Sequence, residues 1–422
     1  MRRLLLIGAT VLMAGLSPGC TRGRTPARPG EEASRSALRP TTAGEGHGKG
    51  DLADPAATAA NTEPPPLVRC FPGDTALDAV RPLSTLLEHA AERFDHGDYR
   101  VALACAEEAA RLEPRSVEAH HDRAAALLEL GRKEEAQAAF TRALALDPDD
   151  PETLAGAADL YINHLPVSND HTETGLEYAR RGARRLKRGR DRELAGRLGL
   201  LAGQALNDLG RSREALTALD AALPMAPDDL RIRYERGVAF FEMCQFEEAR
   251  RSFAEVIERN PSDAWAHHQL GLVLERLGDG AGSERELARA RSLAPGEFAA
   301  PVLLPPEDFR SLVDKEASRL PAALRNDLGM VHLETADLPD TTDLTAEQPP
   351  LSPTILGLFR GTPLGDPQDA SELRTIILYR KNLGRAVTSR EELVAQVRTT
   401  LLHELGHLHG EDDEELRARG LE

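Results

Sequence analysis

Two histidines and a glutamate close to residue 405 have the spacing that a catalytic metal site requires. The chain reads His-Glu-Leu-Gly-His from His403 to His407. On a helix these two histidines project from one face, so both imidazoles can reach the same metal ion. Glu404 lies on the neighbouring flank, where its carboxylate can hydrogen-bond a metal-bound water and accept a proton from it. The pattern predicts hydrolysis at a bound metal.

Gly410 and Asp413 extend this motif by a turn and a further acidic side chain. A glycine at this point can end the helix in a left-handed conformation and return the chain toward the ion. The turn would bring Asp413 within reach as a third ligand, although it could also present Asp412 or Glu414. Three ligands leave a fourth position open for water, which distinguishes a catalytic zinc site from a structural one.

The helix that carries the histidines is predicted to begin at Ser389 and to end at Gly410. Ser389 and Glu392 have the spacing of a capping box, and no proline or glycine follows until Gly406. Two stripes run along this helix: an apolar one of Leu393, Val397, Leu401, Leu405 and Leu408, and another of Gln396, Thr400, His403 and His407. The histidines are therefore expected to face away from the buried stripe, toward a cleft. Gly406 would serve close packing or access of the metal.

These residues resemble the zincin-like metallopeptidases of the minimal zincin fold, small bacterial domains with a terminal H-E-x-x-H-x-x-G-x-x-D motif. The resemblance covers about residues 302–422 and includes the stretches 305–309, 355–364 and 375–380. It implies Zn2+ as the cofactor, with His403, His407 and Asp413 as ligands and Glu404 as the general base. It also suggests that the substrate is a peptide or protein.

The predicted elements of this region fit a small α+β domain. They are a helix at 308–320, strands at 329–333, 354–359 and 375–380, and a loop at 336–353. In zincins generally, the strand that borders the cleft binds an extended substrate through main-chain hydrogen bonds. The candidate is Ile355–Arg360. The alternative is an ordinary edge strand that Arg360 and Pro363 protect from pairing.

Upstream, prolines recur at a fixed interval of 34 residues, at Pro114 and Pro148 and again at Pro227, Pro261 and Pro295. This is the period of tetratricopeptide repeats, which the sequence resembles over residues 83–297. Alanines and glycines share positions between the units, including Gly203, Gly237 and Gly271, which lets paired helices approach closely. About six units are expected to stack into a superhelix, with an insertion read as a loop at His164–Thr174.

Such arrays usually bind a protein segment in their groove, and the alternative is a rigid spacer. The expected groove positions include Tyr234, Phe241, Trp265 and His268. A single basic run, from Arg180 to Arg192, stands in a chain of net charge −17. It is read as a solvated helix face or a match for acidic neighbours, so no nucleic-acid partner is expected.

The first residues predict export. Arg2 and Arg3 precede an apolar run that ends near Leu16, as in a signal peptide of residues 1–20. Residues 16–20 resemble a lipoprotein box, although Ser17 stands where leucine is usual, and lipidation is predicted at Cys20. The linker 21–66 is expected to be disordered. The protein would contact the membrane of the bacterial cell envelope only through this lipid anchor. Simple export and a cytoplasmic chain are the alternatives.

The fold expected for these 422 residues is mainly α: an N-terminal tetratricopeptide α-solenoid at 80–297, followed by a small α+β minimal-zincin domain at 302–422. The predicted function is a zinc metallopeptidase whose repeats recruit a substrate or protein partner. The alternative is a non-catalytic adaptor or scaffold in which the metal site is inactive or structural. The remaining cysteines, Cys70, Cys105 and Cys244, cannot all pair within one chain.

Overall fold

The computed structural model describes residues 68–71, 81–186, 191–346, 348–364 and 373–421. The predicted signal peptide, Cys20 and the linker 21–66 lie outside these residues. Arg69–Glu422 belong to one compact unit. Among the described residues, no helix is both long and apolar enough to cross a membrane.

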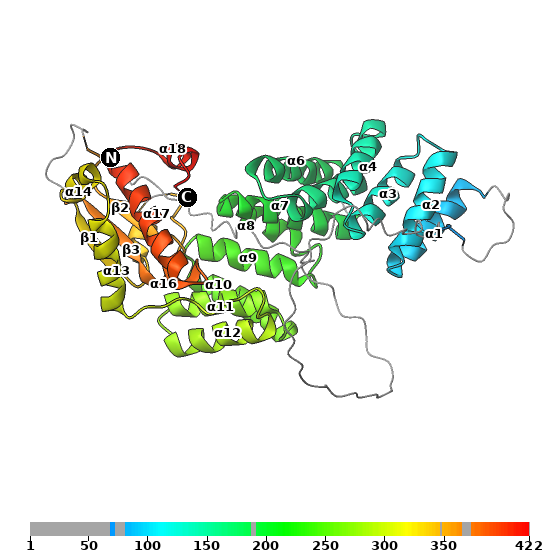
Figure 1. Ribbon diagram of the computed structural model, residues 1–422. Coiled ribbons are helices and arrows are strands. Elements are labelled where there is room, and N and C mark those ends of the chain that lie inside the picture. Colours follow the sequence, from blue (N-terminus) through cyan, green and yellow to red (C-terminus); the bar gives the residue numbers. More distant parts are fainter. Residues whose placement is uncertain (1–67, 72–80, 187–190, 347, 365–372, 422) are drawn as a thin grey trace, which may run out of the picture. The chain divides into compact units, whose positions relative to one another are not determined.

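The first part of this unit is an array of antiparallel helix pairs (Figure 1). Each helix packs on the next one along the chain, as a tetratricopeptide solenoid requires. Within the described residues there are six such pairs, in agreement with the sequence period. The helices are α1 Leu83–Asp95, α2 Tyr99–Leu112, α3 Val117–Glu129, α4 Lys133–Leu146, α5 Pro151–Asp159, α6 Asn169–Arg185, α7 Arg192–Asp208, α8 Ser212–Ala222, α9 Leu230–Glu242, α10 Phe246–Arg259, α11 Ala264–Arg276 and α12 Gly280–Leu293.

Shared glycines let the helices of a pair approach. A Cβ atom built on Gly237 would lie 2.6 Å from the ring of Phe253, which is fully buried and has no room to move. Gly271 meets Leu287 in the same way, again at 2.6 Å. Since an interior glycine costs a helix roughly 1 kcal/mol relative to alanine, close packing is the reason that the repeat keeps it.

The loop predicted for His164–Thr174 is wrong for most of its length. A π-helical turn, η1 Leu160–His164, follows α5, and α6 already begins at Asn169. The hydroxyl of Ser168 accepts a hydrogen bond from the backbone N–H of His171 at 3.2 Å, so it caps α6. Short polar residues favour loops and helix N-termini alike, which is why composition misled the sequence interpretation.

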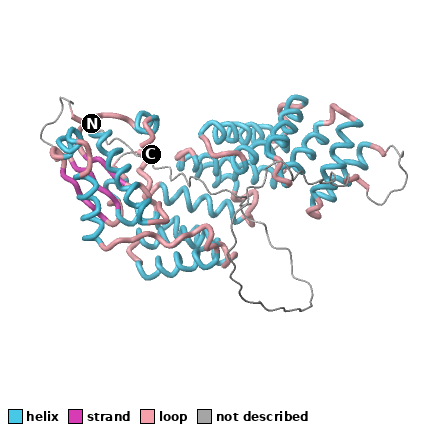
Figure 2. The backbone as a smooth tube through the Cα atoms, viewed as in Figure 1, coloured by secondary structure: helices cyan, strands magenta, loops and turns pink. Residues whose placement is uncertain are grey.

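The second part is a small α+β domain that holds all three strands of the described residues (Figure 2). The sheet order is β1-β3-β2, with β1 parallel and β2 antiparallel to β3. The predicted strand 329–333 is displaced, because residues 329–331 turn out of a short helix that the sequence did not predict. The elements are α13 Pro306–Ser318, α14 Ala322–Leu328, β1 His332–Ala336, α15 Thr341–Leu344, β2 Gly357–Arg360, β3 Thr375–Tyr379, α16 Arg380–Arg385, α17 Arg390–Leu408 and α18 Asp413–Ala418.

The two faces of this sheet belong to different hydrophobic clusters. Phe359, Ile376 and Leu378 pack with the apolar sides of α13 and α17. Leu358 and Ile377, on the opposite face, pack with the segment that contains α15. Helix α17 is in contact with both β2 and β3 (Figure 1), so the helix with the two histidines lies against the edge strand.

Cys244 occupies a backbone conformation that the other repeats give to glycine. Gly97, Gly131, Gly210 and Gly278 end their helices at φ values of 69–83°, and Cys244 takes φ 57° at the equivalent place after α9. A left-handed residue with a Cβ costs about 1–2 kcal/mol. Its side chain is half-buried and packs against the cluster of the α+β domain, with Sγ 3.9 Å from the carbonyl oxygen of Leu351. This packing offsets the backbone cost.

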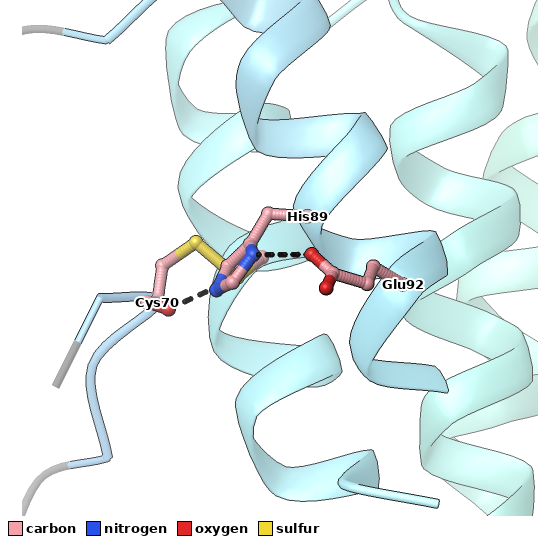
Figure 3. Close-up of a disulfide and its surroundings, with 4 residues drawn as sticks. Cys70, His89 and Glu92 are labelled. Atoms are coloured by element: carbon pink, nitrogen blue, oxygen red, sulfur yellow. Dashed lines mark hydrogen bonds and ion pairs between the residues drawn. A yellow bond between two sulfur atoms is a disulfide. The ribbon is translucent and has the colours of Figure 1, made fainter. Parts of the chain in front are cut away.

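Cys70 and Cys105 form a disulfide that joins the residues before the array to α2 (Figure 3). His89 lies beside the bridge, and its Nδ1 is 3.3 Å from a carboxylate oxygen of Glu92. Cys244 is the free cysteine of the described residues. The three cysteines therefore divide into a pair and a single thiol.

Candidate metal centre

Helix α17 starts where the sequence predicts. The hydroxyl of Ser389 accepts from the backbone N–H of Glu392 at 3.2 Å, which is one half of the expected capping box. The Glu392 carboxylate instead accepts from the backbone N–H of Thr388 at 2.8 Å, one residue earlier. The helix start is thus fixed as predicted, with the return bond shifted by one residue.

Both stripes of α17 are covered by other parts of the fold. The apolar stripe lies in the core with the sheet, as predicted. The second stripe does not line an open face: His403 is 7% exposed and His407 is fully buried. The residues after α17 fold back over the histidines and cover them. Asp413 keeps 30% of its side chain exposed, so solvent reaches the group from its side.

His403, His407 and Asp413 bring one ligand atom each to a common point. The two Nε2 atoms are 3.0 Å apart, and Oδ1 of Asp413 lies 3.4 Å from Nε2 of His403 and 3.3 Å from Nε2 of His407. Ligands bound to a tetrahedral zinc at 2.0–2.1 Å are separated from each other by roughly 3.3–3.4 Å. The spacing of the three atoms matches that of a zinc site.

The hydrogen bonds at Nδ1 make these three atoms acceptors when both rings are neutral. Nδ1 of His407 lies 2.9 Å from the carbonyl oxygen of Glu411, and Nδ1 of His403 is hydrogen-bonded to the carbonyl oxygen of Leu421. Because a carbonyl can only accept, each Nδ1 carries the proton and each Nε2 presents a lone pair. Three acceptors that converge without a donor repel one another unless a cation lies between them.

Positive charge at this point stabilises the Asp413 carboxylate. Burial alone would raise the pKa of this carboxyl, but hydrogen bonds and charge from protonated His403 and His407 outweigh burial and lower the pKa to about 2. The carboxylate is therefore ionised at neutral pH. Its Oδ1, although buried, has no hydrogen-bond partner among the described residues. A divalent cation held by two neutral imidazoles and one carboxylate fits this set of donor atoms.

The turn after α17 selects Asp413 over its acidic neighbours. Gly410 has φ 85° and ends the helix, as the sequence predicts. Asp412 is then the N-cap of α18, where its side chain accepts from the backbone N–H of Glu415 at 2.9 Å. Glu414 points to solvent. Asp413 is the first residue of α18, and it is the one whose carboxylate joins the histidines.

Gly406 allows α18 to pack against α17. A Cβ atom at this position would collide with the side chain of Leu416, which is fully buried, and would lie 2.9 Å from a carboxylate oxygen of Glu411. Of the two roles that the sequence left open, the structure therefore supports close packing. The glycine in the motif holds the helix that carries Asp413 against the helix that carries the histidines.

Glu404 is fully buried next to this group, and neither of its carboxylate oxygens has a hydrogen-bond partner within the described part of the chain. Burial, and then the charge of Asp413, raise the pKa of Glu404 well above its usual value. Gly357 of β2 makes room for it, because a Cβ there would collide with Oε1. A carboxyl with a raised pKa can both accept and return a proton near neutral pH.

Strand β2 borders this carboxylate and is one of the two edge strands of the sheet. The backbone N–H of Tyr379 donates to the carbonyl of Leu356 at 2.9 Å, which makes these residues a hydrogen-bonded pair. In an antiparallel ladder such pairs alternate, so Gly357 and Phe359 direct their backbone groups away from β3. These outward groups of β2 have no strand partner and lie on the side of Glu404, but Gly357 and Phe359 are buried.

No oxyanion donor is identified among the three side chains that the sequence suggested. His332 is exposed and pairs with Glu334 at 3.1 Å, and Arg360 forms an ion pair with Asp343. Tyr379 is buried in the cluster on the other face of the sheet, where burial raises the pKa of its hydroxyl.

Two known protein families match parts of this chain. The family of zincin-like metallopeptidases matches residues 328–421, and that of tetratricopeptide repeats matches residues 87–151, 200–243 and 241–298. The chain carries tetratricopeptide repeats and a zincin-like metallopeptidase domain. The zincin-like match begins after α13, although α13 shares the hydrophobic core of that domain. No curated protein matches the chain.

Three solved structures illustrate the likeness of the repeats. PilW, a widely conserved type IV pilus biogenesis factor, is 19% identical over 51% of this chain and 96% of its own, with a TM-score of 0.45. PilF of Pseudomonas aeruginosa is 13% identical over 51% and 92%, with a TM-score of 0.44. YrrB, a repeat protein with an unusual peptide-binding site, is 20% identical over 45% and 92%, with a TM-score of 0.36.

Of the four residues expected in the groove of the repeats, Phe241 is buried, and Tyr234, Trp265 and His268 are half-buried and contact other rings. Phe241 is buried against Phe246, and Tyr234 stands edge-on to Phe253. Trp265 and His268 both pack on Phe298, the residue that follows the last repeat helices. Aromatic side chains suit a core and a groove equally well, so residue type alone could not separate the two.

The basic run is matched by acidic neighbours, one of the two readings that the sequence offered. Arg181 and Arg185 of α6 both bind Asp149, at 2.9 and 2.6 Å, and Arg180 binds Glu214 at 2.9 Å. Residues 187–190 of the run lie outside the described part.

The ligand assignment predicts a contrast between two neighbouring aspartates. Asp413→Asn removes the anionic ligand and should lower zinc affinity at least tenfold. Asp412→Asn is the matched control, because asparagine caps a helix as well as aspartate does and should leave the affinity unchanged. Competition with a chromophoric chelator measures both. Equal affinities would show that Asp413 is not a ligand.

Burial of Glu404 predicts how the metal-free protein responds to pH. Its pKa is raised on folding, so its stabilising contribution is complete below the unfolded value near 4.5 and is lost as pH rises through the folded value. Glu404→Gln removes this loss, so metal-free Glu404→Gln should melt at a higher temperature than wild type at pH 8 and at the same temperature at pH 4. A difference of equal size at both pH values would contradict the assignment.

Proposed function

We propose that this protein is a zinc-dependent peptidase that hydrolyses peptide bonds, with Glu404 as the general base. The observation that carries the proposal is the convergence of three acceptor atoms, from His403, His407 and Asp413, beside a buried carboxyl with a raised pKa. The match to zincin-like metallopeptidases supports the same reaction class.

The three ligand side chains would hold zinc and leave its remaining positions to water and substrate. When bound, the ion would supply an activated water and polarise a carbonyl group. Glu404 would accept the proton of the attacking water and deliver it to the leaving amine. Its burial favours this role, because the protonated carboxyl between the two transfers has no charge to solvate.

The unpaired edge of β2 would bind the substrate backbone. An extended peptide could add to Gly357 and Phe359 as a further strand, through hydrogen bonds that do not depend on substrate side chains. Gly357 and Phe359 are buried as whole residues, so the part of the chain that covers this edge would have to move to admit the peptide. The absence of a side chain at Gly357 also keeps the route between this edge and Glu404 free.

The repeats would recruit a protein substrate or partner, as tetratricopeptide arrays commonly do. Tyr234, Trp265 and His268 are only half-buried and would contribute to recognition, whereas Phe241 is buried.

Export and lipid attachment at Cys20 also remain a proposal. The disulfide between Cys70 and Cys105 supports an oxidising compartment, since such bonds persist outside the cytoplasm. Metabolic labelling with palmitate should mark the wild-type chain and fail to mark Cys20→Ser. Equal labelling of the two would remove the lipid anchor.

Glu404→Gln tests the enzymatic proposal directly. The full chain, loaded with zinc, is incubated with a mixture of random-sequence peptides, and new termini are counted by mass spectrometry. We expect the variant to lose cleavage by about 10²- to 10⁴-fold while it retains zinc, because it lacks only the proton acceptor. Zinc-loaded wild type that cleaves none of the peptides would favour the adaptor function instead.

A further inference from the structure

The two helices of the metal centre end in the same backbone motif. After α17, the N–H of Gly410 donates to the carbonyl of His407 at 3.0 Å, and the N–H of Glu411 donates to Gly406 at 3.1 Å. This pair of bonds around a left-handed residue is a Schellman cap.

Helix α18 ends in the same motif. Gly420 has φ 73°, and its N–H donates to the carbonyl of Arg417 at 2.9 Å. The N–H of Leu421 donates to the carbonyl of Leu416 at 3.1 Å. The second cap therefore has the same two bonds as the first.

In both caps, the carbonyl of the residue after the glycine accepts a hydrogen bond from a histidine of the metal site. Glu411 accepts from Nδ1 of His407, and Leu421 accepts from Nδ1 of His403. The backbone of each cap turns this carbonyl toward the ring, and the proton on Nδ1 leaves the lone pair of Nε2 facing Asp413. Partners of this kind fix the tautomer and orientation of a ligand histidine and raise its basicity.

Helix α18 is also held in place independently of these bonds. Leu416 fills the space over Gly406, and Arg419 forms an ion pair with Glu411. Because the helix is docked through these contacts, the end of α18 is presented to His403 at a fixed distance. The cap of α18 thus connects the helix that supplies Asp413 to the orientation of a second ligand.

We propose that the paired caps are the positioning device of the metal centre, and that Gly420, which is not a ligand, sets zinc affinity through the Leu421 carbonyl and His403. The proposal rests on zinc binding in the proposed function, but it does not depend on peptide hydrolysis.

A substitution at Gly420 alters the cap without changing a metal ligand. Gly420→Val forces a β-branched residue into a left-handed conformation and should lower the zinc affinity of the full chain by about 10- to 100-fold. Gly131→Val is the matched control: Gly131 has φ 75° and forms the same cap after α3, and neither glycine has an atom within 4 Å of a built Cβ. Gly420→Asn should restore most of the affinity, since asparagine tolerates this conformation.

A second readout follows the tautomer in the metal-free chain. Long-range 1H–15N spectra of 15N-histidine-labelled protein should show the proton of His403 on Nδ1 in wild type and a mixture of tautomers in Gly420→Val. Equal zinc affinities of Gly420→Val and Gly131→Val, or an unchanged His403 tautomer, would overturn the proposal. Wild type that binds zinc but cleaves no peptide would overturn only the peptidase function, whereas wild type that binds no zinc would overturn both.

Discussion

Mutual repulsion among three electron-pair acceptors is the constraint on which the zincin-like domain depends. Nε2 of His403, Nε2 of His407 and Oδ1 of Asp413 lie within 3.0–3.4 Å of one another, and when both rings are neutral the hydrogen bonds at Nδ1 leave none of the three atoms a proton to share. Such a group is unfavourable by itself, because each lone pair faces another. The surrounding fold must hold the atoms together until a cation makes the arrangement favourable.

Small residues allow the elements around the metal site to pack closely. Gly406 admits Leu416, so two helices from one short segment lie close enough to share a metal site. Gly357 admits the carboxylate of Glu404 beside the edge strand. In both places a side chain would occupy the space of a functional group, so the glycines follow from the chemistry as much as from the backbone.

The ligand residues could be predicted from the sequence because their types and spacing carry the signal. His403 and His407 share a helix face, and Gly410 predicts the turn that leads to Asp413. The carbonyls of Glu411 and Leu421 could not be predicted in this way, since every residue has a carbonyl and its direction depends on the turn. The 34-residue interval of the prolines predicted the repeats. The start of α6 was missed because the composition near Ser168 fits a loop and a capped helix equally well.

The disulfide at the start of the array has a mechanical consequence. Tension applied to the chain upstream of Cys70 is transmitted through the sulfur bridge to Cys105, in the middle of α2. Helix α1 lies in the loop closed by this bridge and carries none of the load. A pull on the leading segment would therefore be borne by a helix that already has neighbours on both sides, and the first helix of the stack would not be peeled away.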